Sequence, residues 1–290
     1  MAELPNGNHT VVSVKGEDAT DFPPPPAASS FKDVDLGCSV PFMQKLMAEV
    51  LGTFFLIFAG CASRDGARLL APSLCASVVV SSNENKVVTL PGIAIVWGLA
   101  VTTLVYSLGH VSGAHFNPSV TIAFASCKRF PLKQVPAYMV AQLLGSTLAA
   151  GTLRLLFTGK NDVFFGTSQQ GSDLQAFVME FIITFYLMFI VSGVATDNRA
   201  VGELAGLAVG STVLINVLFA GPITRASMNP ARTLGPAIVS NHWKGIWIYL
   251  TSPILGAVSA AWVYNMFRHT DKPLCEITKA ASFLKGASRS

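Results

Sequence analysis

The sequence contains little charge: 12% of its 290 residues are Asp, Glu, Lys or Arg, whereas 51% are hydrophobic. A soluble domain of this length could hardly cover its surface with so few charged side chains. The first 40 residues also lack a basic start followed by an apolar run, so no cleavable signal peptide is visible. The composition therefore predicts a membrane protein that is inserted through its first spanning helix.

Cysteine is scarce as well, and its pattern excludes several kinds of site. The five cysteines form an odd total without Cys-x-x-Cys spacing, which argues against a disulfide framework or a metal site. No nucleophile–base pair is visible, so an enzyme is not indicated. The net charge of +4 reflects Lys and Arg that flank membrane segments rather than a stripe for nucleic acid. We expect no enzymatic activity, no cofactor, no metal and no bound nucleic acid.

Long apolar stretches lie between two more polar ends of the chain. Residues 1–40, with four consecutive prolines, cannot bury enough apolar surface to fold, so we expect a disordered cytosolic tail there and a second cytosolic tail at 270–290. Between them, several stretches reach the roughly 20 residues that a spanning helix needs. They cover residues 42–63, 88–109, 134–157, 175–196, 202–221 and 245–268. The ionisable residues within their apolar centres are Glu49 and Glu180.

Two Asn-Pro motifs each open a segment that is too short to cross a bilayer. They are Asn117-Pro118-Ser119 and Asn229-Pro230-Ala231. Asn caps a helix through its side-chain oxygen, and Pro suits the first helical position because its missing N–H is not needed there. Each motif therefore predicts a short re-entrant helix. Two such N-termini meeting at mid-membrane would repel cations and protons but not neutral solutes.

The motifs lie in two similar halves, residues 42–158 and 174–268. Three spans per half is an odd number, so the halves must insert with opposite orientation. We expect an all-α membrane protein: a bundle of six transmembrane helices plus two re-entrant half-helices in inverted repeats, within a channel domain at 41–269. Glu49 and Glu180 occupy matching positions, which favours hydrogen bonds to the re-entrant loops over a proton relay.

The paired motifs, with Ser112-Gly113-Ala114-His115 before the first and Arg232 after the second, resemble the major intrinsic protein family of aquaporins and glycerol facilitators. Residues 90–98, 193–200 and 202–206 are similar to the plant nodulin-like intrinsic proteins. The resemblance implies an aquaporin-like homotetramer, surrounded by lipid of the plasma membrane or an internal plant membrane, with both termini cytosolic. It implies passage of water and small neutral solutes such as glycerol, and leaves urea, metalloid acids, lactic acid and ammonia open.

The resemblance also implies an outer constriction formed by Trp97, Val217, Ala226 and Arg232. Water-selective members carry His where this chain has Val217, so the ring is expected to be amphipathic and to pass glycerol alongside modest water. Thr233 stands where glycerol facilitators usually carry Asp, which argues against placing the chain among them.

Three features depart from the family pattern. Ser119 replaces the usual Ala and adds a hydroxyl near the pore centre, from which we expect little effect. Arg225 stands where the family usually has a small residue, and its repeat partner is Gly113. Arg225 is expected to narrow or charge the vestibule. Residues 64–77 form an unusual insertion in the first external loop.

The C-terminal tail contains a predicted phosphorylation site, and two other functional classes stay open. Ser282, in Lys279-x-x-Ser282, resembles the subfamily's site for a calcium-dependent kinase and is predicted to be phosphorylated. A coupled secondary transporter can also use inverted repeats and broken helices, although the apolar centres of the spans contain no Asp or Lys. A non-conducting or altered-selectivity variant stays open because of the insertion and Arg225.

Overall fold

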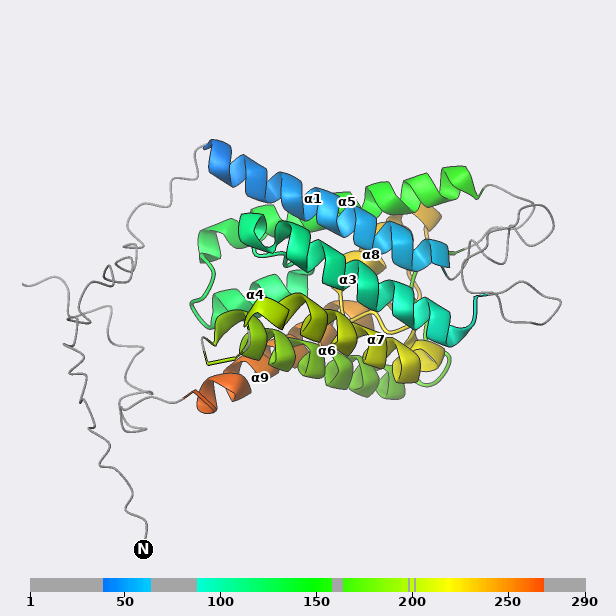
Figure 1. Cartoon of the computed structure of the whole chain (residues 1–290). Helices are drawn as coiled ribbons and strands as arrows, with labels where there is room; N and C mark the ends of the chain where they lie inside the picture. The colour runs from blue at the N-terminus through cyan, green and yellow to red at the C-terminus, as the bar shows by residue number, and fades with distance from the viewer. Residues whose placement is uncertain (1–38, 64–87, 158–163, 198, 201, 269–290) are drawn as a thin grey trace, which may run out of the picture. The chain divides into compact units, whose positions relative to one another are not determined.

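The structure, a computed structural model, describes residues 39–63, 88–157, 164–197, 199–200 and 202–268. All regular structure in these residues is helical (Figure 1). The long helices there are α1 (Val40–Cys61), α3 (Leu90–Ser112), α5 (Val135–Leu156), α6 (Asp173–Thr196), α7 (Ala205–Thr224) and α9 (Ile246–Met266). The short helices are α4 (Pro118–Ser126) and α8 (Pro230–Ser240), with single 3-10 turns at Leu132–Gln134 and Gly202–Leu204. The predicted fold class is confirmed.

Some helix ends differ from the predicted stretches. The second stretch was expected to end at residue 109, but α3 continues to Ser112 and stops where Gly113 adopts a φ of 90°. The fifth was expected at 202–221, but α7 extends to Thr224, because Pro222 is accommodated inside the helix and Arg225, at a φ of 64°, ends it. Hydropathy marks where apolar residues end, whereas the helix ends where the backbone turns.

Several predicted segments lie outside the described residues. These are most of the N-terminal tail (1–38), the insertion at 64–77 and the C-terminal tail that contains Ser282. α1 begins at Val40, the last residue of the predicted tail, with a proline in its first turn. The predicted domain bounds stay predictions.

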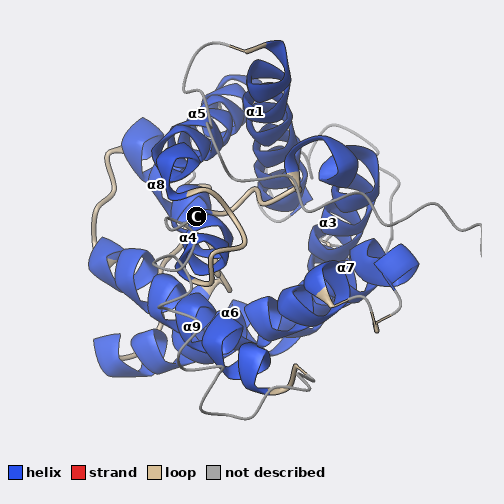
Figure 2. Cartoon of the chain, turned by 90° about the vertical axis from the view of Figure 1, so that its left-hand side faces the viewer, coloured by secondary structure: helices blue, strands red, loops and turns tan. Residues whose placement is uncertain are grey.

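Helix packing is the same in both halves of the described chain. α1 packs against α5 and α3, and its counterpart α6 packs against α9 and α7. Each short helix packs mainly against a long helix of the opposite half, α4 against α9 and α8 against α5. α3 also packs against α7, and α4 contacts α8. Figure 2, a view along the helices, shows α4 inside the arrangement of long helices. An inverted repeat produces this pairing.

Two glycines let α3 and α7 approach closely. A methyl carbon added to Gly98 would lie 2.8 Å from the carbonyl oxygen of Gly210, and one added to Gly210 would lie 2.4 Å from the carbonyl oxygen of Gly98. Neither position therefore has room for a side chain. Small residues at such crossings allow helices to pack in lipid, where burial of apolar side chains gives no driving force.

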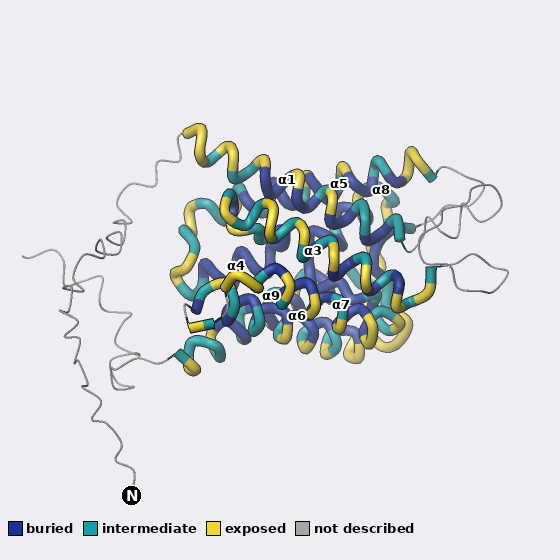
Figure 3. The backbone as a smooth tube through the Cα atoms, in the orientation of Figure 1, coloured by how far each residue is buried: buried dark blue, intermediate teal, exposed yellow. Residues whose placement is uncertain are grey.

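The polarity of the bundle is typical of a membrane protein. Exposed positions recur along the long helices (Figure 3). Large apolar residues are among the exposed ones, for example Leu51 and Phe55 on α1. In contrast, Glu49, Gln142 and Glu180 are completely buried. The exposed apolar side chains can face lipid on the outside of the bundle, while the buried polar groups pair with one another inside it.

Candidate pore

Each Asn-Pro motif caps the short helix that follows it. The Oδ1 atom of Asn117 accepts a hydrogen bond from the backbone N–H of Ser119 at 2.9 Å. Oδ1 of Asn229 accepts from the backbone N–H groups of Ala231 at 2.9 Å and Arg232 at 3.3 Å. The proline after each Asn is the first residue of its helix. Both helices therefore begin with the positive end of their dipoles at the motifs.

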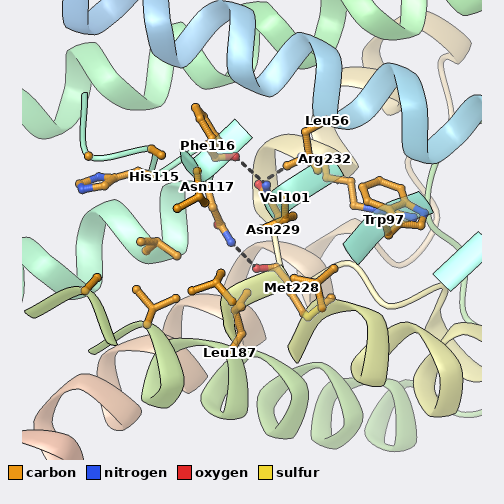
Figure 4. A pocket seen from close by; sticks show the side chains of 18 of the residues that line it. Leu56, Trp97, Val101, His115, Phe116, Asn117, Leu187, Met228, Asn229 and Arg232 are labelled. Carbon is orange, nitrogen blue, oxygen red and sulfur yellow. Dashed lines mark hydrogen bonds between the residues drawn. The ribbon is translucent and has the colours of Figure 1, made fainter. Parts of the chain in front are cut away.

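The two motifs also bind each other (Figure 4). Nδ2 of Asn117 donates to the carbonyl oxygen of Met228 at 2.8 Å, and Nδ2 of Asn229 donates to the carbonyl oxygen of Phe116 at 2.8 Å. Phe116 and Met228 each precede the Asn of their own motif and have φ values of 50° and 55°. These two residues were not among the predicted site residues, although their matching places in the repeats are visible in the sequence.

Glu49 holds the first re-entrant loop. Its Oε1 atom accepts hydrogen bonds from the backbone N–H of His115 at 3.0 Å and the hydroxyl of Ser112 at 2.7 Å. Its Oε2 atom accepts from the backbone N–H of Phe116 at 2.7 Å and from Nε2 of Gln142 at 2.8 Å. One carboxylate thus satisfies two loop N–H groups that have no helix to bind them.

Glu180 occupies the equivalent position beneath the second loop. Oε1 accepts from the backbone N–H of Ser227 at 2.9 Å, and Oε2 accepts from the backbone N–H of Met228 at 2.8 Å. The two acids therefore make matching contacts with the backbone of the loop in each half. This geometry is that of a structural support for each loop.

Two cavities lie along the residues that these loops position. The smaller one, of about 110 Å³, is lined by both motif asparagines and by apolar side chains such as Leu56 and Leu187. The larger one, of about 310 Å³, is lined by Leu90 and Pro222 among others. Trp97 and Arg232 line both cavities. These two side chains therefore mark the boundary between the cavities.

The residues predicted for the outer constriction meet around this boundary. In addition to Trp97 and Arg232, Val217 lines the larger cavity and Ala226 lines the smaller one. The guanidinium carbon of Arg232 lies 4.7 Å from the centroid of the Trp97 ring, within the range of a cation–π contact. Nη2 of Arg232 also donates to the carbonyl oxygen of Arg225 at 3.1 Å.

Arg225 is one of the residues that line the larger cavity. Nη1 donates to the carbonyl oxygens of Gly166 at 2.8 Å and Phe164 at 3.4 Å, and the residue lines the cavity. Arg225 therefore lines the larger cavity, and its guanidinium is bound by carbonyls of residues that do not line it. The expectation that Arg225 narrows or charges the vestibule stays a prediction.

Ser119 lies beside the cavities rather than in their walls. It is completely buried, and it is not among the residues that line either cavity. The expected hydroxyl near the pore centre therefore does not face either of these cavities. Its Oγ atom has no hydrogen-bond partner within the described chain.

Comparison with known proteins identifies the family of the chain. The family profile described as Major intrinsic protein matches residues 38–264. The chain belongs to this family. It is 67% identical over 269 residues to Aquaporin NIP1-2 of Arabidopsis thaliana, covering 89% of this chain and 87% of that protein. It is 64% identical over 252 residues to Nodulin-26 of Glycine max, covering 87% and 88% respectively.

A solved structure shares the arrangement of helices. The aquaglyceroporin from Plasmodium falciparum is 27% identical and matches with a TM-score of 0.64, covering 82% of this chain and 99% of that chain.

The family match and the plant relatives together show that this chain is a plant nodulin-like intrinsic protein, as its motifs predicted. It is a multi-pass membrane channel for water and small solutes, which pass passively, and not an enzyme.

A charged pair lies just beyond the spanning part of α6 in this aquaporin. Nη2 of Arg199 lies 2.7 Å from Oδ2 of Asp197, which also accepts a hydrogen bond from the Tyr264 hydroxyl at 3.2 Å. The hydrogen bonds from Arg199 hold the pKa of the Asp197 carboxyl well below its usual range. Neither residue of this pair was among the predicted site residues. Within the part of the chain that is described, no three His, Cys, Asp or Glu side chains are grouped to hold a metal ion.

Proposed function

We propose that this channel conducts glycerol and other small uncharged solutes together with water, and that four residues select them. These are Trp97, Val217, Ala226 and Arg232. The observation that carries the proposal is that Trp97 and Arg232 line both cavities, so a solute moving from one cavity to the other passes this pair. Arg232 supplies hydrogen-bond donors, whereas Trp97 and Val217 supply apolar surface. A solute with hydroxyls on one side and carbon on the other suits such a wall.

We also propose that the channel excludes protons and other ions. The N-termini of α4 and α8 meet at the two motifs, and each carries about half a positive charge. The hydrogen bonds from Asn117 and Asn229 keep these termini together. A cation would face both partial charges at once, whereas a neutral solute would not.

The test is solute flux through purified protein in proteoliposomes, measured by stopped-flow light scattering. The panel contains water, glycerol, urea, boric acid, lactic acid and ammonia. Val217→His adds bulk and a polar group near Arg232, so glycerol flux should fall sharply while water flux holds or rises. Val217→Leu, which adds bulk without polarity, is the matched control. Equal loss of water and glycerol flux in Val217→His would mean that the constriction lies elsewhere.

The same vesicles separate this proposal from the two other functional classes. A channel equilibrates a solute but never concentrates it. Glycerol accumulation above the external concentration under an ion gradient would instead support a coupled transporter. Absence of flux for every solute in the panel would support the non-conducting variant.

Assembly, placement and regulation complete the proposal. We propose a homotetramer in the plasma membrane or an internal plant membrane, whose channel domain (41–269) lies between two cytosolic tails. Ser282, which lies outside the described residues, is proposed as the target of a calcium-dependent kinase, because Lys279-x-x-Ser282 resembles the subfamily's kinase site. A phosphate there would add nearly two negative charges to a basic tail. Intact mass measurement after kinase treatment tests it, and an unmodified Ser282 would refute it.

A further inference from the structure

Helix α1 carries two glycines against which aromatic rings of the pore are packed. A methyl carbon added to Gly60 would lie 2.2, 2.3 and 2.4 Å from Cε2, Cζ2 and Cδ2 of Trp97. One added to Gly52 would lie 2.0 Å from Cε1 of Phe116. Carbon atoms in contact are normally about 3.5–4.0 Å apart. Neither glycine can therefore gain a side chain unless the ring moves.

These glycines belong to one face of α1. Gly52, Leu56 and Gly60 are spaced by four residues, which places them along one side of the helix. Leu56 lines the smaller cavity directly, and Figure 4 shows it together with Phe116 and Trp97 on the side of α1 that faces the pore. α1 therefore reaches the pore once through its own side chain and twice through rings that lie against its backbone.

The contact at Gly60 involves the face of the Trp97 ring. The added carbon would be almost equally far from three bonded ring atoms, which places it above the ring rather than at its edge. The helix backbone blocks movement of the ring toward α1. Trp97 also lines both cavities, so a ring displaced from α1 has open space beside it.

We propose that Gly60 is a positioning residue that sets the width of the passage bordered by Trp97 and Arg232. The inference rests on the proposed function, in which this passage selects solutes. Gly60 itself touches no solute, and it acts by letting the Trp97 ring lie flat against α1. A methyl group at this position forces the ring by more than about 1 Å into the passage, because the contact must return to about 3.5 Å. Glycerol is wider than water and is therefore excluded first.

A role of Gly60 in helix packing alone makes a different prediction. Ala is the better helix former, so α1 itself would not be weakened by Gly60→Ala. A packing defect elsewhere would reduce the amount of folded channel and would scale all fluxes equally. Only a displaced Trp97 ring changes the ratio of glycerol to water permeability.

The test measures this ratio in proteoliposomes, normalised to the amount of reconstituted protein. Gly60→Ala should lower the glycerol-to-water ratio by about tenfold, as expected for one methyl group in a fitted site. Gly151→Ala on α5 is the matched control, because an added carbon there meets nothing within 4 Å. Its ratio should stay unchanged.

A compensating substitution identifies the ring as the cause. Trp97→Phe removes part of the ring that would clash, so adding Gly60→Ala to Trp97→Phe should change the ratio far less than adding it to the native chain. If Gly60→Ala alone cannot be recovered as folded protein, recovery of the double variant supports the proposal, and failure of both variants overturns it.

Val217→His, measured in parallel, keeps the two proposals apart. An unchanged ratio in Gly60→Ala while Val217→His shifts it overturns the role of Gly60 and leaves the proposed function intact. An unchanged ratio in both variants overturns the proposed constriction, and the role of Gly60 with it.

Discussion

The guanidinium of Arg232 lies 4.7 Å from the ring of Trp97, and both side chains are almost entirely buried. The contact joins a residue of α3 to a residue of α8, which come from opposite halves of the chain. The carbonyl of Arg225 holds the same guanidinium from another side. The passage between the cavities is therefore bordered by two groups that fix each other's position.

Removal of the Trp97 ring should widen this passage. In Trp97→Leu we expect higher glycerol flux and a higher glycerol-to-water ratio, because the apolar wall recedes while Arg232 keeps its carbonyl partner. Stopped-flow measurements of both solutes check this. Trp262→Leu is the control, since Trp262 is exposed on the outer face of α9. A fall in glycerol flux in Trp97→Leu would contradict the placement of the constriction.

Arg225 has a left-handed backbone that favours glycine. Its φ is 64°, and its repeat partner Gly113 has a φ of 90°. Arg225→Gly and Arg225→Ala remove the same contacts, but only Ala keeps a Cβ in this conformation. The Gly variant should therefore be more stable by about 1 kcal/mol in thermal unfolding. Both variants should retain the native solute ratio, because the carbonyl that binds Arg232 is unchanged. Equal stability of the two would contradict this assignment.

Glu180 should not tolerate replacement by its amide. Gln offers one acceptor oxygen where the carboxylate serves Ser227 and Met228 with two. One buried N–H then loses its partner, which costs about 1–3 kcal/mol. We expect a lower midpoint of thermal unfolding in detergent for Glu180→Gln. Glu203→Gln makes the same chemical change at an exposed position and should leave the midpoint unchanged. Identical midpoints for both variants would refute the supporting role.

Ser119→Ala should stabilise the protein without altering transport. The Oγ atom is buried without a described partner, so its removal relieves a desolvation penalty of about 1 kcal/mol or more. Water and glycerol fluxes should not change, since Ser119 lines neither cavity. Thr121→Val on the same helix is the contrasting variant, because Oγ1 of Thr121 does form hydrogen bonds and its loss should destabilise. A changed flux in Ser119→Ala would place the hydroxyl in the pore.

The pair of Asp197 and Arg199 should act independently of pH near neutrality. The pKa of folded Asp197 is lowered, so its stabilising effect is complete above the unfolded value of about 3.9 and is lost only as the pH falls toward the folded value. The difference in unfolding midpoint between the native chain and Asp197→Asn should therefore be constant between about pH 5 and 8. A difference that disappears between these values would show that Asp197 titrates there.

The features that could be predicted from the sequence are those that depend on short segments of the chain. The Asn-Pro motifs predicted the starts of α4 and α8 because capping needs only three or four neighbouring residues. Hydropathy located the six spans because a bilayer fixes their length. The matching places of Glu49 and Glu180 indicated a shared role for a similar reason: the repeats made their comparison possible.

Contacts between distant segments were harder to predict. Nothing in the sequence near Gly60 shows that the Trp97 ring lies against it, since that contact depends on how α1 packs beside α3. The bond from Asn117 to the Met228 carbonyl likewise depends on the meeting of two loops. The conformation of Arg225 could have been read from its alignment with Gly113, because a glycine that ends a helix often has positive φ.

The hydrogen bonds between the two motifs can form only after the second half of the chain has been synthesised. The Asn117 amide finds its acceptor 111 residues further along the chain, and α4 packs mainly against α9, the last described helix. At a translation rate of about 5–20 residues per second, the first motif waits roughly 5–20 s for its partner to be made. Until then, the first half of the newly synthesised chain holds a capped helix start in the membrane without its partner. A truncated product that ends before Met228 therefore lacks the acceptor that completes the first half.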